Sequence, residues 1–258
     1  MRNGKVLILV MMVLLFLIGL AVFLYPYINK AVVDTTLRND AQEFIDRVTV
    51  ELWEEEILPE EQEQAEPTVP TEPLYMDLLE AMQEYNERIY LEDQEGLCDP
   101  WSYQQPSFTL GDYGLENEVF GVISIPKLDL EMPLYLGATY QHLADGVAHL
   151  SQTSLPIGGI NTNCVIAGHR GWKGASYFRY ITELKPGDEV TITNLWGSLT
   201  YEVTGTKIIQ PNDVEKILIQ KDRELLTLLT CHPYASGGKQ RFLVICEKDY
   251  VKHQANNE

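Results

Sequence analysis

An uninterrupted apolar segment near the N-terminus limits what this chain can fold into more than any other feature. Residues 6–28 contain no charged side chain, while Arg2 and Lys5 precede them and Lys30 follows. An α-helix rises about 1.5 Å per residue, so a helix of this length matches the roughly 30 Å hydrocarbon core of a bilayer. The only alanine in the segment, Ala21, is not part of an Ala-x-Ala cleavage site, which favours an uncleaved anchor.

The charge around this segment predicts its orientation. The chain of 258 residues has a formal net charge of -19, and glutamates are concentrated between positions 51 and 66. A short basic N-terminus followed, after the span, by an acidic block favours a cytoplasmic N-terminus and an extracytoplasmic remainder. So negative a chain also lacks the basic face that phosphate binding needs, which argues against a nucleic-acid partner. Residues 1–30 are therefore interpreted as a single-pass anchor in the cell membrane.

The residues after the anchor divide into three segments. Residues 31–58 combine apolar residues at helical spacing with many charges, and predict a helical stalk. The prolines and glutamates of residues 59–73 indicate a linker that cannot form a core, so 31–73 is interpreted as an acidic stalk and linker. Residues 74–117 begin with an amphipathic helix, whose apolar face is expected to dock on the following domain. That face comprises Leu74, Met76, Leu79 and Met82.

From residue 118 the sequence becomes rich in β-branched and aromatic residues, with glycine and proline between the runs. Many short strand candidates and few helices favour a closed or nearly closed β-barrel over a doubly wound parallel sheet. The predicted fold is therefore mainly β, with a barrel at 118–250, a tail at 251–258, and the membrane helix and helical stalk in front. "NLWG" fits a hairpin turn between two strands. Short helical pieces are expected among the strands, near 139–147, 175–184 and 213–220.

One cysteine and one arginine bracket a short loop in this barrel. Cys231 ends the apolar run "TLLTC", and Arg241 opens the next run. Antiparallel pairing would bring Arg241 beside Cys231, where a guanidinium lowers the pKa of a thiol and can donate to an acyl oxyanion. A cysteine nucleophile also needs a nearby imidazole. His169, in the glycine-bounded "VIAGHRG", is the first candidate, and His149 and His232 are alternatives on the sequence alone.

The cysteine count leaves other roles open. The four cysteines are Cys98, Cys164, Cys231 and Cys246, and an extracytoplasmic setting would permit two disulfides that the spacing does not assign. Cys231 could also be a buried small hydrophobe. The sequence has no CxxC motif and no Cys/His cluster with zinc-finger spacing, so no metal site is expected.

These motifs together resemble the sortases, the membrane-bound cysteine transpeptidases of Gram-positive bacteria. The resemblance covers residues 78–247, and the stretch 120–171 looks like the central part of the class C, pilin-type sortases. It implies that Cys231 attacks the Thr–Gly peptide of an LPxTG-like sorting signal and forms an acyl-thioester. It also implies that His169 is the general acid and base, and that Arg241 stabilises the oxyanion and positions the signal. Thr230 either adds a hydroxyl contact to the substrate or is an ordinary β-branched strand residue.

Class C sortases also carry a lid before the barrel, with an Asp-Pro-aromatic sequence. Here "LCDPWSYQQPSF" supplies Asp99, Pro100 and Trp101. The resemblance implies that the aspartate pairs with Arg241 and that the indole covers the catalytic cysteine. The alternative is an Asp-Pro turn followed by a surface tryptophan. Cys98, beside this motif, is expected to be a free thiol, with a lid-locking disulfide as the alternative.

The resemblance predicts transfer of the acyl group to an amine, without a metal or organic cofactor. The acceptor would be a pilin lysine in pilus polymerisation, or a cell-wall peptide amine if the enzyme anchors surface proteins. The lid favours polymerisation, whereas the lack of a second, C-terminal apolar span weakens it slightly. The loop "HPYASGGKQ" departs from the usual class C pattern, so the resemblance assigns no substrate contacts to this loop. A non-catalytic, membrane-anchored barrel that binds a partner, with a structural Cys231, is a different possibility.

Overall fold

The computed structural model describes residues 2–56, 75–102, 106–115, 118–172 and 174–248. The expected linker at 59–73, Leu74 of the expected amphipathic helix and the expected tail at 251–258 lie outside these residues.

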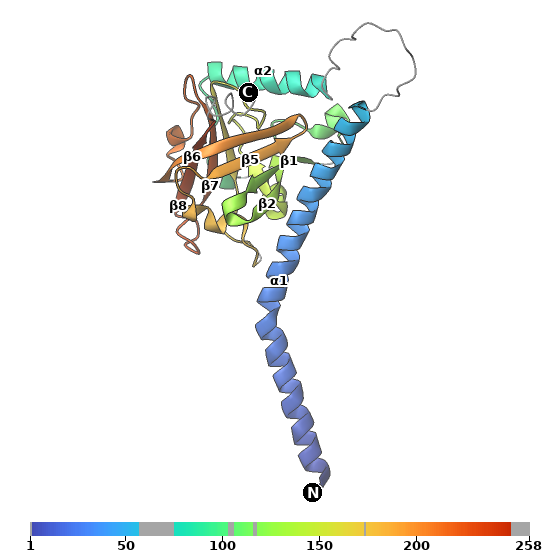
Figure 1. Cartoon of the computed structure of the whole chain (residues 1–258). Coiled ribbons are helices and arrows are strands. Elements are labelled where there is room, and N and C mark those ends of the chain that lie inside the picture. Colours follow the sequence, from blue (N-terminus) through green and yellow to red (C-terminus); the bar gives the residue numbers. More distant parts are fainter. Residues whose placement is uncertain (1, 57–74, 103–105, 116–117, 173, 249–258) are drawn as a thin grey trace, which may run out of the picture.

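The apolar segment and the stalk form one continuous helix, α1 (Arg2–Glu56). Its most apolar 18-residue window has a mean hydropathy of 3.3 and is not buried against the rest of the protein. This length and composition fit a membrane-spanning anchor. Pro26 lies inside α1, and the helix bends part-way along its length (Figure 1). A proline removes one backbone hydrogen bond from the helix, which accounts for a bend of this kind.

The stalk half of α1 is helical as predicted, but it packs along the barrel rather than standing free of it (Figure 1). It contacts β1 (Val119–Ile125) and β2 (Leu130–Leu136). The spacing of the buried residues follows one face of a helix, so the apolar stripe gives the stalk its place on the barrel. The buried residues of this stripe are Leu37, Ala41, Phe44 and Val48.

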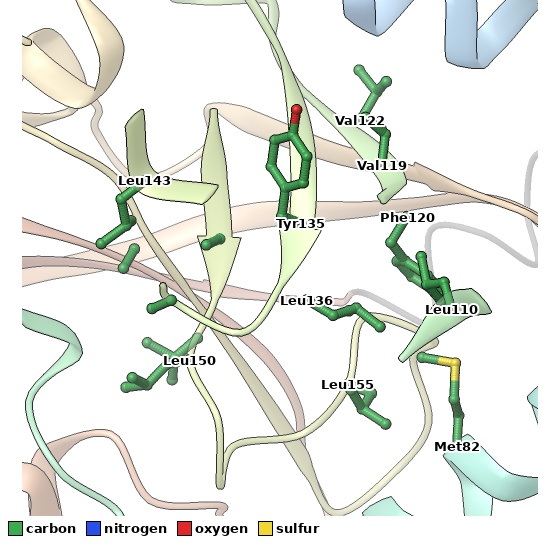
Figure 2. Packing of buried hydrophobic residues seen from close by; sticks show 14 of the residues in the cluster. Met82, Leu110, Val119, Phe120, Val122, Tyr135, Leu136, Leu143, Leu150 and Leu155 are labelled. Atoms are coloured by element: carbon green, nitrogen blue, oxygen red, sulfur yellow. The ribbon is translucent and has the colours of Figure 1, made fainter. Parts of the chain in front are cut away.

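The predicted amphipathic helix is α2 (Met76–Leu91), and its docking face differs from the expected one. Of the expected face, Met82 is fully buried, while Met76 and Leu79 are only half-buried. The observed stripe starts at Leu78, which shifts the buried face around the helix. Figure 2 shows Met82 reaching from α2 toward Leu110 and Leu155. The buried residues of α2 are Leu78, Met82, Tyr85, Asn86 and Ile89.

The predicted closed β-barrel is present. Around the barrel the strands follow the order β1-β2-β3-β4-β7-β8-β6-β5. The pairs β2–β3 and β4–β7 are parallel and the other neighbours are antiparallel. The remaining strands are β3 (Val147–His149), β4 (Thr162–Ala167), β5 (Glu189–Asn194), β6 (Gly197–Ile209), β7 (Glu224–His232) and β8 (Gln240–Glu247).

Short helices and turns connect these strands, close to where the sequence placed them. The expected hairpin at "NLWG" joins β5 to β6, with Asn194 opposite Gly197. The lid motif begins a single 3₁₀ turn, η1 (Pro100–Ser102). The other short helices are η2 (Leu110–Tyr113), η3 (Pro126–Leu128), α3 (Tyr140–Asp145), η4 (Tyr177–Glu183) and η5 (Val214–Lys216).

Candidate active site

Cys231 and Arg241 are directly opposite each other on adjacent antiparallel strands. Cys231 lies near the end of β7, Arg241 lies near the start of β8, and the two are paired in the strand register. Nη1 of Arg241 is 3.9 Å from Sγ of Cys231. The expected juxtaposition of thiol and guanidinium is therefore present, because a hairpin returns the chain to the neighbouring position.

The parallel pairing of β4 with β7 brings His169 to the same edge of the barrel. Ala167 at the end of β4 is opposite Leu229 of β7, so His169 and Cys231 each lie two residues beyond this pair. The hydroxyl of Thr230 donates to the carbonyl of Gly168 at 2.7 Å, and the amide of Gly168 donates to the carbonyl of Leu229 at 3.1 Å. These two bonds fix the residues just before the histidine and the cysteine against each other.

Thr230 is fully buried, and its hydroxyl is used in this bond between strand ends. This buried hydrogen bond fits the role of an ordinary strand residue, which is one of the two roles that the sequence left open for Thr230. A direct contact between Thr230 and substrate stays a prediction.

The lid motif lies on Arg241. Oδ1 and Oδ2 of Asp99 accept hydrogen bonds from Nε and Nη2 of Arg241 at 2.6 and 2.7 Å. The indole of Trp101 lies with its centroid 4.6 Å from the guanidinium carbon. Only 6% of the arginine side chain and 18% of the aspartate side chain are exposed, so the pair is largely shielded from water. A bidentate ion pair of this kind fixes both position and orientation of the guanidinium.

The segment that carries the lid is held on both sides by polar residues on or just after α2. Before the lid, the side chain of Gln94 donates to the carbonyl of Gln152 at 2.9 Å and accepts from the amide of Ile219 at 2.6 Å. After the lid, the hydroxyl of Tyr85 lies 3.0 Å from Oγ of Ser107. The lid is thus a short turn between two fixed points.

His169 is 8% exposed and surrounded by aromatic rings. Its imidazole stacks on Trp172 with a centroid separation of 4.4 Å and an interplanar angle of 11°. The rings of Tyr177 and of Trp101 each lie 6.2 Å away. The lid tryptophan therefore lies close to both the arginine and the histidine of the site.

Burial moves the pKa values of the thiol and the imidazole in opposite directions. Burial raises the pKa of Cys231 above its ordinary value, against the opposing effects of the nearby Arg241 and Arg170, and Asp99 raises it further. Burial lowers the pKa of His169 to about 4. In this conformation, the neutral thiol and neutral imidazole are therefore favoured over the thiolate–imidazolium pair.

The two alternative histidines occupy other environments. His149 is completely buried, its Nε2 lies 3.0 Å from the carbonyl oxygen of Thr153, and burial lowers its pKa to about 4. His232 has its Nδ1 2.8 Å from Nη1 of Arg170. His149 thus contacts the backbone of the barrel, and His232 contacts the guanidinium of Arg170.

Two neighbours of Cys231, Arg170 and Gly238, were not predicted from the sequence. Nη1 of Arg170 donates to the carbonyl oxygen of Cys231 at 3.3 Å. The carbonyl oxygen of Gly238 accepts from Nη1 of Arg241 at 2.6 Å, and a Cβ at Gly238 would lie 3.2 Å from Sγ of Cys231. Gly238 also has a φ of +73°, a conformation that favours glycine. Arg170 was visible within "VIAGHRG" and Gly238 within "ASGGKQ", but neither string indicates which atoms these residues reach.

All four cysteines lie in the described part of the chain, and none of them is in a disulfide there. Cys164 and Cys246 are buried, and Sγ of Cys98 lies 3.0 Å from Oγ of Ser102. Among the described residues, no group of three or more histidine, cysteine or acidic side chains could hold a metal ion.

Comparisons with known proteins agree with this arrangement. The family model described as "Sortase domain" matches residues 123–249. The crystal structure of sortase C-1 from Actinomyces oris is 30% identical with a TM-score of 0.60, and the match covers 68% of this chain and 99% of that chain. A structure described as "Sortase C1 of GBS Pilus Island 1", from group B Streptococcus, is 28% identical with a TM-score of 0.66, covering 83% of this chain and 92% of that one. The chain belongs to the sortase family, whose members are cysteine transpeptidases.

The curated relatives carry other class names. Sortase D of Bacillus subtilis (strain 168) is 32% identical over 126 residues, which are 48% of this chain and 61% of that protein. This match thus spans about three-fifths of the relative's length. The predicted family and fold are confirmed, whereas the class within the family differs between the curated relatives and the solved structures.

Proposed function

We propose that this chain is a membrane-anchored sortase that cleaves an LPxTG-like sorting signal and transfers it to an amine. The observation that carries the proposal is the pair of Cys231 and Arg241, held on adjacent strands with Nη1 3.9 Å from Sγ. The family membership and the position of His169 at the same barrel edge support it.

In the first half of the reaction, the thiolate of Cys231 attacks the carbonyl carbon of the Thr–Gly peptide in the sorting signal. A C–S bond forms, and the carbonyl oxygen gains negative charge. Arg241 lies beside the sulfur, so its guanidinium can donate to this oxyanion. The C–N bond then breaks as His169 gives a proton to the leaving glycine amine, which leaves an acyl-thioester on the enzyme.

In the second half, the acceptor amine attacks the thioester carbonyl. His169 removes the proton that the attacking amine loses, a new amide bond forms, and the C–S bond breaks to return the thiolate. Proton and bond counts balance without an external oxidant, metal or cofactor.

The lid keeps this site in an unreactive protonation state. Burial raises the pKa of Cys231 and lowers that of His169, and the carboxylate of Asp99 adds to the first shift. Opening the lid would admit water, remove the carboxylate from Arg241 and move both pKa values toward their ordinary ranges. The active thiolate–imidazolium pair thus belongs to the open form, and Asp99 and Trp101 act as an autoinhibitory latch.

The acceptor that fits best is the ε-amine of a pilin lysine, as in a class C enzyme. The Asp99 and Trp101 contacts with Arg241 support this, as do the solved relatives, one of which is described as a pilus-island sortase. A cell-wall peptide amine is the second candidate, because the curated relatives are called sortase D and sortase A. The anchor helix would hold the catalytic domain on the extracytoplasmic side of the cell membrane, with a cytoplasmic N-terminus.

The test is a transpeptidation assay with the full chain in lipid nanodiscs. A fluorescent LPxTG-like peptide is supplied with a lysine-containing pilin fragment or with a cell-wall stem peptide, and the ligated products are separated by mass. We expect ligation to the pilin lysine, no ligation by Cys231→Ala, and a larger loss in Arg241→Ala than in Arg241→Lys. The lysine variant keeps the charge and loses the guanidinium fork. Unchanged ligation by Cys231→Ala would refute the proposed nucleophile, and exclusive use of the stem peptide would assign the chain to wall anchoring.

A further inference from the structure

The ring of Trp172 supports the ring of His169. The two rings are stacked, with centroids 4.4 Å apart and an interplanar angle of 11°. Trp172 also meets Tyr140 edge-on at 6.3 Å. The imidazole therefore faces an extended aromatic surface that belongs to the barrel side of the site and not to the lid.

Trp172 is presented by a short loop that folds back on itself. The amide of Trp172 donates to the carbonyl of Ala175 at 3.2 Å, and the amide of Ala175 donates back to Trp172 at 2.9 Å. The amide of Phe178 donates to the carbonyl of His169 at 2.9 Å, which closes the base of the loop. Gly171 has a φ of +90°, which lets the chain turn immediately after the histidine segment. The loop thereby fixes the indole relative to the backbone of His169.

The far side of this loop rests on α1, which runs alongside the barrel (Figure 1). The amide of Ser176 donates to Oδ1 of Asp34 at 3.3 Å. A Cβ at Gly174 would lie 3.2 Å from Nδ2 of Asn29 and 3.8 Å from the carbonyl of Pro26. The contact lies on the part of α1 where the apolar segment ends, so the loop joins the histidine to the helix at that point.

We propose that Trp172 is a positioning residue for His169, and that Asp34 on the anchor helix holds the loop that presents it. The inference rests on the proposed function, in which His169 is an imidazolium at the start of the first half-reaction and becomes one again in the second. An aromatic face parallel to an imidazolium stabilises its positive charge, and a fixed ring keeps the proton-carrying nitrogen in line with the reacting groups. The helix that anchors the protein is then also a structural support of the active site.

The experiment uses the full chain in lipid nanodiscs with histidine-selective isotope labels. Trp172→Leu keeps an apolar side chain without a π face, whereas Trp172→Phe keeps the face. Asp34→Ala removes the acceptor for the amide of Ser176, whereas Asp34→Asn keeps an oxygen at that position. Asp46→Ala, an exposed carboxylate that accepts from Gln42 elsewhere on α1, is the matched control.

Two quantities are measured for each variant. The first is kcat and KM for cleavage of a sorting peptide. The second is the ring-current shift of the His169 imidazole protons, with the signal assigned by its loss in His169→Gln. We expect Trp172→Leu to lower kcat about tenfold with KM within about twofold, and Trp172→Phe to keep most of kcat, because a cation–π contact acts only when the imidazolium forms. Asp34→Ala should lower kcat about threefold and reduce the ring-current shift, while Asp34→Asn and Asp46→Ala match the wild type.

Wild-type kcat in Trp172→Leu would overturn the role of the tryptophan. A ring-current shift that Asp34→Ala leaves unchanged would overturn the role of the anchor helix. Failure of the proposed function would show separately, as transpeptidation that survives Cys231→Ala, because the ring-current shift reports the stack whether or not the protein is active.

Discussion

The strength of the ion pair between Asp99 and Arg241 sets how much the closed lid is favoured over the open one. Asp99→Ala removes both hydrogen bonds to the guanidinium, at 2.6 and 2.7 Å, and leaves Trp101 as the remaining contact of the lid with Arg241. The substitution also removes the negative charge that raises the pKa of Cys231. Both effects should make the thiol more reactive, so the experiment has to separate access from ionisation.

The size of the first effect follows from the geometry. Charge-assisted hydrogen bonds contribute about 1.5–3 kcal/mol each, and two bonds that share one carboxylate are not additive, so the latch stabilises the closed lid by about 2–3 kcal/mol. An energy gap of that size leaves roughly 0.5–3% of molecules open. Removing the latch should raise the open fraction by about tenfold or more. If the remaining contacts add nothing, the equilibrium constant for opening rises about 30–150-fold and the open fraction reaches about one half, a rise of roughly 15–80-fold.

The assay is the rate of Cys231 alkylation at pH 7 by a bulky maleimide and by small iodoacetamide. A lower thiol pKa accelerates both reagents, whereas lid opening accelerates the bulky reagent more. We expect Asp99→Ala to accelerate the bulky reagent about tenfold or more, and the small reagent by less. Glu95→Ala, an exposed carboxylate in the same segment, should match the wild type. A bulky-reagent rate in Asp99→Ala within twofold of the wild-type rate, in a protein that melts normally, would refute the latch.

Three further substitutions test other parts of the site. Gly238→Ala should lower kcat/KM about tenfold more than Gly237→Ala, because both residues have a φ of +73° but only position 238 crowds the thiol and guanidinium; equal losses would contradict this. Thr230→Val should lower the free energy of unfolding by about 1–3 kcal/mol, since the buried carbonyl of Gly168 loses its donor, and Thr230→Ser should restore it in denaturant titrations. His149→Gln should flatten the pH dependence of the free energy of unfolding. Burial lowers the pKa of His149 to about 4, so the neutral ring is accommodated at no cost above about pH 6.5. As the pH falls toward 4, up to about 3 kcal/mol of the free energy of unfolding is lost. If the free energy of unfolding, measured by urea titration, changes with pH equally in the wild type and in His149→Gln, the prediction for His149 is wrong.

The sequence predicted the barrel and the Cys231–Arg241 pair for a local reason. Alternating β-branched runs separated by turns define strands, and a hairpin of known length defines which residues face each other. The contact of Asp99 with Arg241 is different, since the two residues are 142 positions apart. No spacing rule reaches that far, and its prediction came from the resemblance to a family.

The features that were predicted wrongly, or not predicted, are set by contacts between segments that are far apart in the sequence. Helical periodicity showed that residues 74–91 are amphipathic, but the position of the buried stripe is set by the barrel surface, which selects Leu78. The stalk likewise shows apolar spacing, but nothing local shows that β1 and β2 are its partner. Arg170 reaches the carbonyl of Cys231 across 61 positions, because β4 and β7 pair in parallel.

The central claim is that Cys231 forms an acyl-thioester with a sorting signal. The direct measurement is mass spectrometry of the Asp99→Ala protein after incubation with an LPxTG-like peptide and no acceptor amine, followed by proteolysis to locate the adduct. A mass increase equal to the peptide up to its threonine is expected on the fragment that contains Cys231, and hydroxylamine should remove it. No adduct on this fragment, or an equal adduct on a fragment with Cys98, would contradict the account.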